Sequence, residues 1–144
     1  MKVGIINKSN NPLPEYKTDG SSGLDIRANI DDPIIIQPGE RQAVSTGLYV
    51  DLPINTELQI RPRSGLAIKN GITVLNTPGT IDADYRGEIL VILINLSNDE
   101  FKIHTGDRIA QMVVAKVDKI TWDSKSILTQ TKRGKGGFGS TGKN

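Results

Sequence analysis

The chain has 144 residues, of which 18 are basic and 16 acidic, with a net charge of +2 and no cysteine. This length suits one domain, and the near balance of charge excludes a general polyanion-binding protein, so we expect no nucleic-acid partner. Without thiols, and with His104 as the single histidine, disulfides and zinc sites are excluded. Neither a signal peptide nor a membrane span is recognisable, which predicts no membrane partner and a cytoplasmic protein, or an intracellular one in a host if the source is viral.

Short apolar stretches with a period of two recur along the chain and predict β-strands. Turn sequences such as QPGE, KNG and TPGT separate them, and the only helical candidate is one or two turns capped by Ser64 and ended by Gly71. We therefore expect an all-β fold, a jelly-roll or β-clip-like barrel of short strands. The predicted strands lie within residues 2–6, 33–40, 47–52, 57–62, 71–75, 88–97, 101–103 and 108–117.

Composition changes at residue 131, where apolar residues stop and glycine takes over. This predicts a domain over residues 1–130 and a flexible arm over residues 131–144. Glycine N–H groups, the hydroxyls of Ser140 and Thr141 and the guanidinium of Arg133 suit an anion, and Phe138 suits stacking on a base. The alternative is a disordered tail that only adds solubility.

Two polar segments interrupt the strands. GTIDADYRGEI, residues 79–89, holds acids and a tyrosine at a predicted hairpin, where a carboxylate such as Asp82 can orient or deprotonate water. Its alternative is a solvated turn with an ion pair between Asp84 and Arg86. RPRSGLA, residues 61–67, brings Arg63 and Ser64 to a helix start, which suits an anion but also describes an ordinary helix cap.

Two further segments carry single polar residues in extended stretches. SGLDIRA, residues 22–28, contains Asp25, for which an exposed surface acid is the default interpretation. GDRIAQMV, residues 106–113, contains Gln111 within an apolar strand, where the amide needs a partner from another strand or from a ligand.

Taken together and in this order, SGLDIRA, RPRSGLA, GTIDADYRGEI, GDRIAQMV and RGKGGFGSTG resemble the five motifs of the homotrimeric dUTP pyrophosphatases, the dUTPases. The resemblance covers essentially the whole chain. It implies a jelly-roll trimer with shared active sites that hydrolyses dUTP to dUMP and pyrophosphate, limiting uracil in DNA and supplying dUMP for thymidylate synthesis.

The resemblance also implies roles for individual residues. Asp82 would hold the water that attacks the α-phosphorus, and Tyr85 would pack under the deoxyribose and exclude a ribose 2′-hydroxyl. Asn76 and backbone groups from there to Ile81, including those of Gly79, would read uracil in a β-hairpin pocket.

Phosphate, metal and arm contacts are implied in the same way. Asp25 would reach Mg²⁺ through its water shell, and Phe138 would stack over uracil as the arm closes on the site. The phosphate-binding and arm residues implied are Arg63, Ser64, Gly65, Gln111, Arg133, Gly139, Ser140 and Thr141.

Two alternatives to dUTP hydrolysis share this fold or this surface. A dCTP deaminase of the same fold needs a catalytic glutamate in the pocket, where this chain offers Asp82 within DADYRG. A trimer that binds nucleotides without catalysis is the second alternative, and the intact Asp82, Tyr85, Arg133 and Phe138 argue against it.

Overall fold

The computed structural model describes residues 1–137, and in them the backbone forms eleven strands and one short helix. The all-β fold predicted from the alternating apolar residues is therefore confirmed. The elements are, in chain order, β1 (Gly4–Asn7), β2 (Leu24–Arg27), β3 (Ile34–Ile36), β4 (Arg41–Ser45), β5 (Leu48–Asp51), β6 (Thr56–Arg61), α1 (Ser64–Asn70), β7 (Ile72–Val74), β8 (Gly79–Ile81), β9 (Leu90–Asn95), β10 (Phe101–Ile103) and β11 (Arg108–Lys116).

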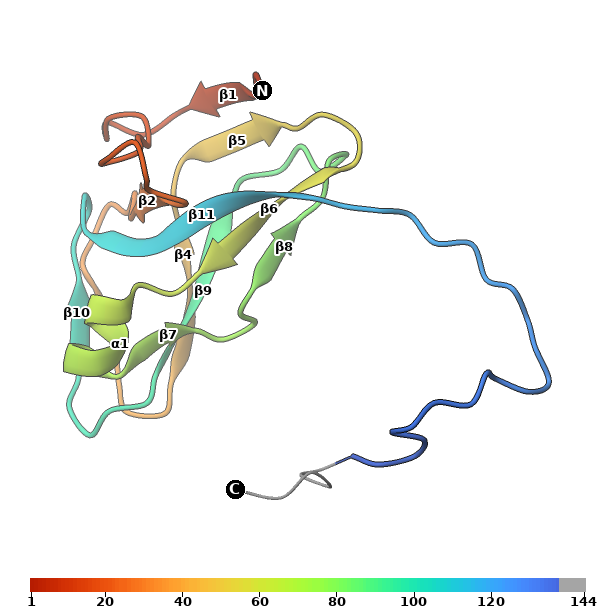
Figure 1. Cartoon of the computed structure of the whole chain (residues 1–144). Coiled ribbons are helices and arrows are strands. Elements are labelled where there is room, and N and C mark those ends of the chain that lie inside the picture. The colour runs from red at the N-terminus through yellow and green to blue at the C-terminus, as the bar shows by residue number, and fades with distance from the viewer. Residues whose placement is uncertain (138–144) are drawn as a thin grey trace.

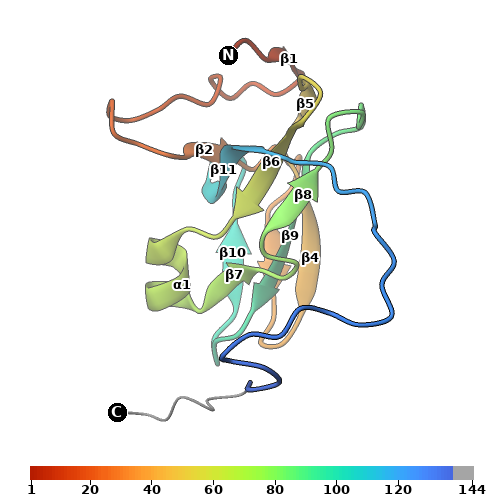
Figure 2. The same ribbon diagram turned by 45° about the vertical axis from the view of Figure 1, so that its right-hand side comes forward.

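The strands form four antiparallel sheets. The largest has the order β2-β11-β6-β8, a second has the order β4-β9-β7, and the pairs β1-β5 and β10-β3 complete the set. Figures 1 and 2 show the four-stranded sheet crossing the three-stranded sheet, with α1 beside β7 at one end of the molecule. Eight of the eleven strands were predicted, and β2, β4 and β8 were missed. The sequence of β4, RQAVS, is largely polar and gives no apolar strand pattern.

Both connections that flank β8 cross between sheets. The strand β8 pairs with β6, whereas β7 and β9 pair with each other in the three-stranded sheet. The hairpins predicted around residues 76–81 and 79–89 are therefore wrong. The chain reaches β8 from one sheet and leaves it for the same sheet, so residues 75–78 and 82–89 are crossing loops.

The core lies between the sheets, and two of its central strands, β6 and β9, show regular alternation of buried and less buried side chains. In β6 the side chains of Thr56, Leu58 and Ile60 are buried, and in β9 those of Val91 and Leu93 are fully buried. These two strands thus turn one face inward, as the period of two predicts. No buried side-chain nitrogen or oxygen in residues 1–137 lacks a hydrogen-bond partner.

The helix α1 begins one residue earlier than expected. Arg63, with extended backbone angles, is the residue that precedes the first turn, and its side chain forms no capping hydrogen bond. The prediction that Ser64 caps this helix is therefore wrong, because Ser64 is its first helical residue and is exposed. Its end was predicted correctly, since the N–H of Gly71 donates to Ala67 O at 3.1 Å.

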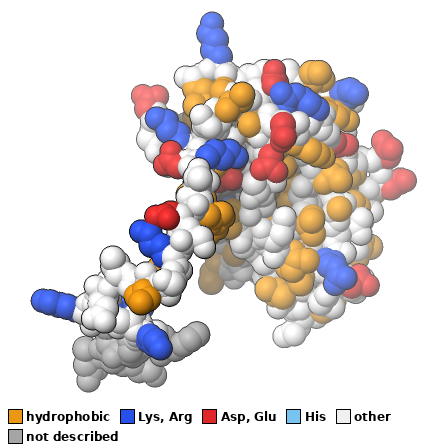
Figure 3. All heavy atoms as spheres, turned by 90° about the vertical axis from the view of Figure 1, so that its right-hand side faces the viewer, with side chains coloured by type: hydrophobic (Ala, Val, Ile, Leu, Met, Phe, Trp, Pro, Cys, Tyr) orange, Lys and Arg blue, Asp and Glu red, His pale blue; other side chains and the backbone are white. Residues whose placement is uncertain are grey.

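The chain leaves the barrel after β11. Val117 N–H donates to Asn55 O at 2.9 Å, and no helix or strand follows in the described part of the chain. Figure 3 shows this segment standing away from the body of the molecule. Four of its large apolar side chains, Ile120, Trp122, Ile127 and Leu128, are at least 71% exposed. Among residues 1–137, no helix has the length and hydrophobicity needed to cross a membrane.

Replacing Leu93 by alanine tests this core. The side chain is fully buried in β9, so Leu93→Ala is expected to lower the free energy of unfolding by about 2–5 kcal/mol. Leu96→Ala is the control, because Leu96 follows the same strand and is 67% exposed. Urea unfolding at one fixed protein concentration measures both, and equal losses would contradict the assigned core.

Candidate active site

Three charged side chains from distant parts of the sequence meet at one end of the four-stranded sheet. Arg63 Nε donates to Asp25 Oδ1 at 2.9 Å, and Arg108 Nη1 donates to Asp25 Oδ2 at 3.0 Å. We call Asp25, Arg63 and Arg108 the arginine cluster. Asp25 is not the exposed surface acid that its sequence favours, because its side chain is only 21% exposed and bridges two guanidinium groups.

Gln111 lies beside this cluster because β11 pairs on both sides. Its register partners are Asp25 in β2 and Arg61 in β6. The side-chain Nε2 donates to Pro62 O at 3.0 Å, which supplies the partner that a polar residue in this strand requires. A side chain at Gly23 would come within 3.3 Å of the Gln111 amide carbon, so the glycine makes room for this amide.

Ser64 and Gly65 begin α1 next to Arg63 and are both exposed. The first helical hydrogen bond runs from Ala67 N–H to Arg63 O, so the N–H groups before it have no partner within the helix. A Cβ added at Gly65 would meet nothing within 4 Å. The backbone here is open to a ligand from outside the chain.

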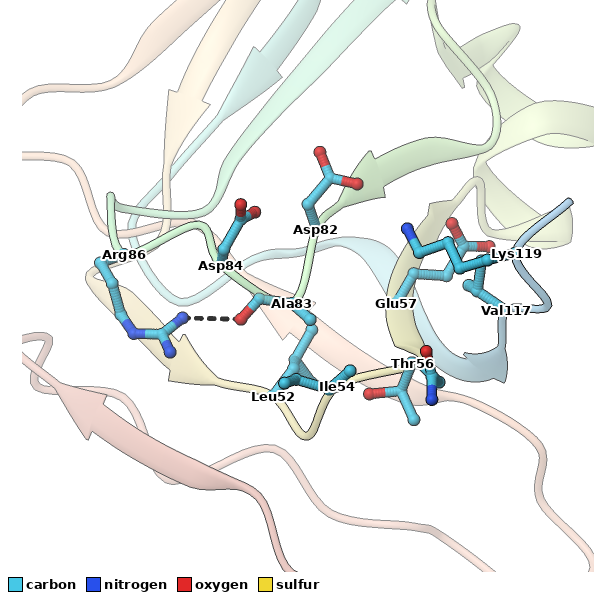
Figure 4. A pocket seen from close by; sticks show the side chains of 11 residues that line it. Leu52, Ile54, Thr56, Glu57, Asp82, Ala83, Asp84, Arg86, Val117 and Lys119 are labelled. Atoms are coloured by element: carbon cyan, nitrogen blue, oxygen red, sulfur yellow. Dashed lines mark hydrogen bonds between the residues drawn. The ribbon is translucent and has the colours of Figure 1, made fainter. Parts of the chain in front are cut away.

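Asp82 begins the loop of residues 82–88, which we call the acidic loop. Figure 4 shows the carboxylates of Asp82 and Asp84 projecting to the same side, away from Leu52 and Ile54. The loop borders an open pocket of 620 Å³. Within the loop, Tyr85 N–H donates to Asp82 O at 3.1 Å, which closes a turn.

Arg86 stabilises the acidic loop by hydrogen bonds to two of its backbone carbonyl groups. Its guanidinium donates to Ala83 O at 2.8 Å, a bond drawn in Figure 4, and to Tyr85 O at 3.0 Å. It also forms an ion pair with Asp51 at the end of β5. The ion pair expected between Asp84 and Arg86 is therefore wrong, and Asp84 is exposed.

The Tyr85 side chain packs against the backbone of its own loop. Its hydroxyl donates to Glu88 O at 3.0 Å. A Cβ added at Gly87 would overlap the hydroxyl and lie 2.9 Å from ring atom Cε2. Tyr85 is nevertheless 42% exposed, so the loop covers the ring only in part.

Asn76, Gly79 and Ile81 lie in and before β8. This strand ends the order β2-β11-β6-β8, so among the described residues its outer backbone groups have no strand partner. Gly79 is buried, and a Cβ there would come within 3.3 Å of both Asn76 Nδ2 and the Cβ of Ile60. The Asn76 side chain therefore lies beside the start of an edge strand.

The arginine cluster and the acidic loop lie at opposite ends of β6. Ile81 pairs with Leu58, so Asp82 follows near Glu57, whereas Arg63 follows the far end of the strand, where Figure 1 shows α1. At about 3.3 Å per extended residue, the residues from Glu57 to Arg63 separate the two groups by roughly 20 Å. One chain does not bring Asp82 and Arg63 to the same small ligand.

Arg133 is the only predicted arm residue in the described part of the chain. It is exposed, and its Nε donates to Gly136 O at 2.9 Å. The predicted contacts of Phe138, Gly139, Ser140 and Thr141 lie outside the described residues.

Sequence reasoning missed Arg108 and Glu88 near these groups. Arg108 follows a TGD turn and falls at a register irregularity between β11 and β2, which no sequence pattern indicates. Glu88 accepts hydrogen bonds on one carboxylate oxygen from the Ser45 hydroxyl, from Thr46 N–H at 3.1 Å and from Gly47 N–H at 2.8 Å. An acid two residues before the apolar strand β9 was the available signal for a partly buried contact.

The environment of Glu88 lowers its pKa. Partial burial by itself raises the pKa, but the hydrogen bonds from Ser45, Gly47 and Thr46 act in the opposite direction, and nearby Lys8 adds to them. Together these interactions hold the pKa of Glu88 below its ordinary value, so the carboxylate is ionised at neutral pH.

Comparison with known proteins agrees with this arrangement of motifs. The dUTPase family model matches residues 9–142, and the chain belongs to this family. The deoxyuridine 5′-triphosphate nucleotidohydrolase of Finegoldia magna is 56% identical, with 99% of each chain covered. The enzyme of the same name from Treponema denticola is 61% identical, with 90% of each chain covered.

Solved structures show the same fold. A mutant dUTPase of Staphylococcus bacteriophage 80alpha, solved with dUpNHpp, matches with a TM-score of 0.88 over 98% of each chain at 20% identity. A mutant dUTPase of the Staphylococcus aureus phage phi11, described for its structural Mg(II) ion, matches with a TM-score of 0.81 at 18% identity, covering 90% of this chain and all of that one. The predicted jelly-roll class is thereby confirmed.

The lowered pKa of Glu88 makes a prediction about acid stability. Its carboxylate stabilises the fold above the ordinary carboxyl pKa, and that stability is lost as pH falls through the lowered folded pKa. Wild type is therefore expected to melt at a higher temperature than Glu88→Gln near pH 7, with the difference shrinking as the pH falls below the ordinary carboxyl pKa. Thermal melts followed by circular dichroism measure this, and a difference that stays constant with pH would contradict it.

Proposed function

We propose that this chain hydrolyses dUTP to dUMP and pyrophosphate at sites built from more than one copy of the chain. Membership of the dUTPase family supports the reaction. The single observation that carries the shared site is the separation of the acidic loop from the arginine cluster along β6. Each copy then contributes half of two different sites.

In the proposed reaction, Asp82 binds a water molecule and accepts its proton as the water oxygen attacks the α-phosphorus. The new P–O bond forms while the bond from the α-phosphorus to the bridging oxygen breaks, and pyrophosphate leaves with that oxygen. The exposed carboxylate of Asp82, on the open side of the acidic loop, supports this role.

The proposed phosphate side consists of the arginine cluster, Gln111 and the open start of α1. Arg63 can donate bidentately to phosphate oxygens, and the N–H groups and hydroxyl at Ser64 and Gly65 can add further bonds. Asp25 holds Arg63 and Arg108 in position before any phosphate binds. Charge-stabilising donors fixed in advance lower the barrier more than donors that must first reorganise.

We propose that Mg²⁺ binds with the substrate and is reached by Asp25 through water. Mg²⁺ keeps several waters and is usually held by one or two carboxylates plus substrate phosphates. Residues 1–137 contain no group of three His, Cys, Asp or Glu side chains that could hold a metal ion, which suits an ion carried by the triphosphate. Each oxygen of Asp25 accepts one arginine bond and retains capacity for a metal-bound water. When bound, Mg²⁺ neutralises charge on the phosphate oxygens.

The proposed nucleoside side consists of Asn76, the outer edge of β8 and Tyr85. Unpaired backbone groups at a sheet edge can pair with the polar edge of uracil as a neighbouring strand would. The exposed part of the Tyr85 ring would lie under the deoxyribose. The arm, with Arg133 and the residues beyond it, would close over the bound nucleotide.

A homotrimer would complete these sites. Four exposed apolar side chains of residues 120–128, Ile120, Trp122, Ile127 and Leu128, support assembly, because large apolar side chains left in water favour contact with another surface. A rotationally symmetric ring of copies lets the acidic loop of each copy face the arginine cluster of the next.

The catalytic assignment is tested by Asp82→Asn. An amide fits the same space but accepts no proton, so kcat for dUTP is expected to fall by on the order of 10²–10⁴ with binding of a non-hydrolysable dUTP analogue retained. Asp84→Asn is the matched control, since it removes a neighbouring exposed acid and should keep kcat within about threefold. Pyrophosphate release measures both, and equal losses would contradict a specific role for Asp82.

The shared site is tested by mixing two inactive variants. Arg63→Ala and Asp82→Asn, co-expressed in equal amounts, should assemble trimers in which about one quarter of the sites combine an intact Arg63 with an intact Asp82. Activity near one quarter of wild type is expected, measured against each variant alone. If the mixture is no more active than its parents, the two residues act within one chain.

A further inference from the structure

The turn between β4 and β5 donates three hydrogen bonds to the carboxylate of Glu88. Glu88 Oε1 accepts the Ser45 hydroxyl, Thr46 N–H at 3.1 Å and Gly47 N–H at 2.8 Å. We call residues 45–47 the corner turn. Bonds to an ionised acceptor are roughly twice as strong as neutral ones, so a single side chain fastens the acidic loop to this turn.

The corner turn contacts the residues that directly follow β1, Lys8 and Ser9. Gly47 has φ of +69°, and its carbonyl accepts Lys8 N–H at 2.8 Å. A Cβ at Gly47 would lie 2.8 Å from Ser9 N, so only glycine allows this close approach. Glu88 is therefore attached to a fixed part of the barrel.

The Tyr85 ring contacts the backbone at Glu88 and at the preceding residue, Gly87. Tyr85 donates to the carbonyl of Glu88, and its ring lies against Gly87. The next residue, Ile89, donates its N–H to Leu48 O at 2.8 Å and accepts the Thr46 hydroxyl at 2.6 Å. The support under Tyr85 is thus bonded to the corner turn through both Glu88 and Ile89.

We infer that Glu88, held by the corner turn, is a positioning residue that fixes the Tyr85 ring and thereby sets the discrimination between deoxyribose and ribose nucleotides. The inference rests on the proposed function, in which Tyr85 lies under the sugar. Glu88 touches no substrate in this arrangement and acts through the backbone of residues 87 and 88. Rejecting an added hydroxyl requires a rigid surface, because a ring that can move aside makes room for it.

The test compares kcat/KM for dUTP with kcat/KM for UTP in each variant. This ratio is independent of the fraction of protein that is folded, so a purely structural loss leaves it unchanged. Glu88→Ala is expected to lower the dUTP preference about tenfold, and Glu88→Gln about twofold to threefold, because one amide oxygen can still accept from the corner turn. Glu40→Ala is the matched control: Glu40 accepts Gln37 N–H at 3.1 Å in the turn at the other end of β4.

Tyr85→Ala distinguishes a failure of the positioning role of Glu88 from a failure of sugar selection by Tyr85. If Tyr85→Ala lowers the dUTP preference and Glu88→Ala leaves it at the wild-type value, the positioning role of Glu88 is overturned while the proposed function stands. If Tyr85→Ala also leaves the preference unchanged, sugar selection by Tyr85 fails and the inference fails with it.

Ser45→Ala keeps the inference testable if Glu88→Ala does not fold. It removes one of the three bonds to the carboxylate and leaves the backbone bonds in place. A loss of dUTP preference of about twofold to threefold is expected. A wild-type preference in Ser45→Ala together with Glu88→Gln would overturn the positioning role.

Discussion

The double pairing of β11 is the constraint on which the phosphate side of this site depends. At Gln111 the strand faces Asp25 in β2 and Arg61 in β6, so three segments more than 30 residues apart in the sequence share one level of the sheet. Two residues beyond Arg61, the chain turns into α1 and brings Arg63 onto Asp25. A slip of one residue in either ladder would turn Gln111 to the other face of the sheet and separate it from Asp25.

Much of the fold and less of the site followed from the sequence. Period-two patterns and short apolar runs predicted β6, β9 and β11, and buried side chains of all three strands join the core. Hairpins around β8 were predicted wrongly because short strands joined by tight loops usually pair, and no local signal tells the chain to cross between sheets. Asp25 was read as a surface acid because its two partners, Arg63 and Arg108, are 38 and 83 residues away. Local patterns indicate secondary structure, whereas ion pairs of this kind depend on tertiary register.

The crossing loops around β8 leave one strand edge unpaired on the proposed nucleoside side of the site. Since both neighbours of β8 in sequence pair elsewhere, the strand keeps one unpaired edge among the described residues, and the acidic loop that follows has few ladder bonds of its own. The loop is held instead by side chains, by Arg86 from one side and by Glu88 from the other. An open edge and a loop fixed by side chains leave backbone groups and part of the Tyr85 ring accessible to a ligand.

Local charge rather than net charge explains how this chain can attract a triphosphate. A net charge of +2 gives a weak overall field, and the Debye length of about 8 Å at physiological salt screens most of it. Arg63 and Arg108 are instead held together by the single carboxylate of Asp25, which leaves an excess positive charge at the start of α1. The same carboxylate limits their mutual repulsion and orients them before the substrate arrives. The acid that the family resemblance assigns to the metal thus has a second effect in the free chain, because it preorganises the cations that receive the phosphates.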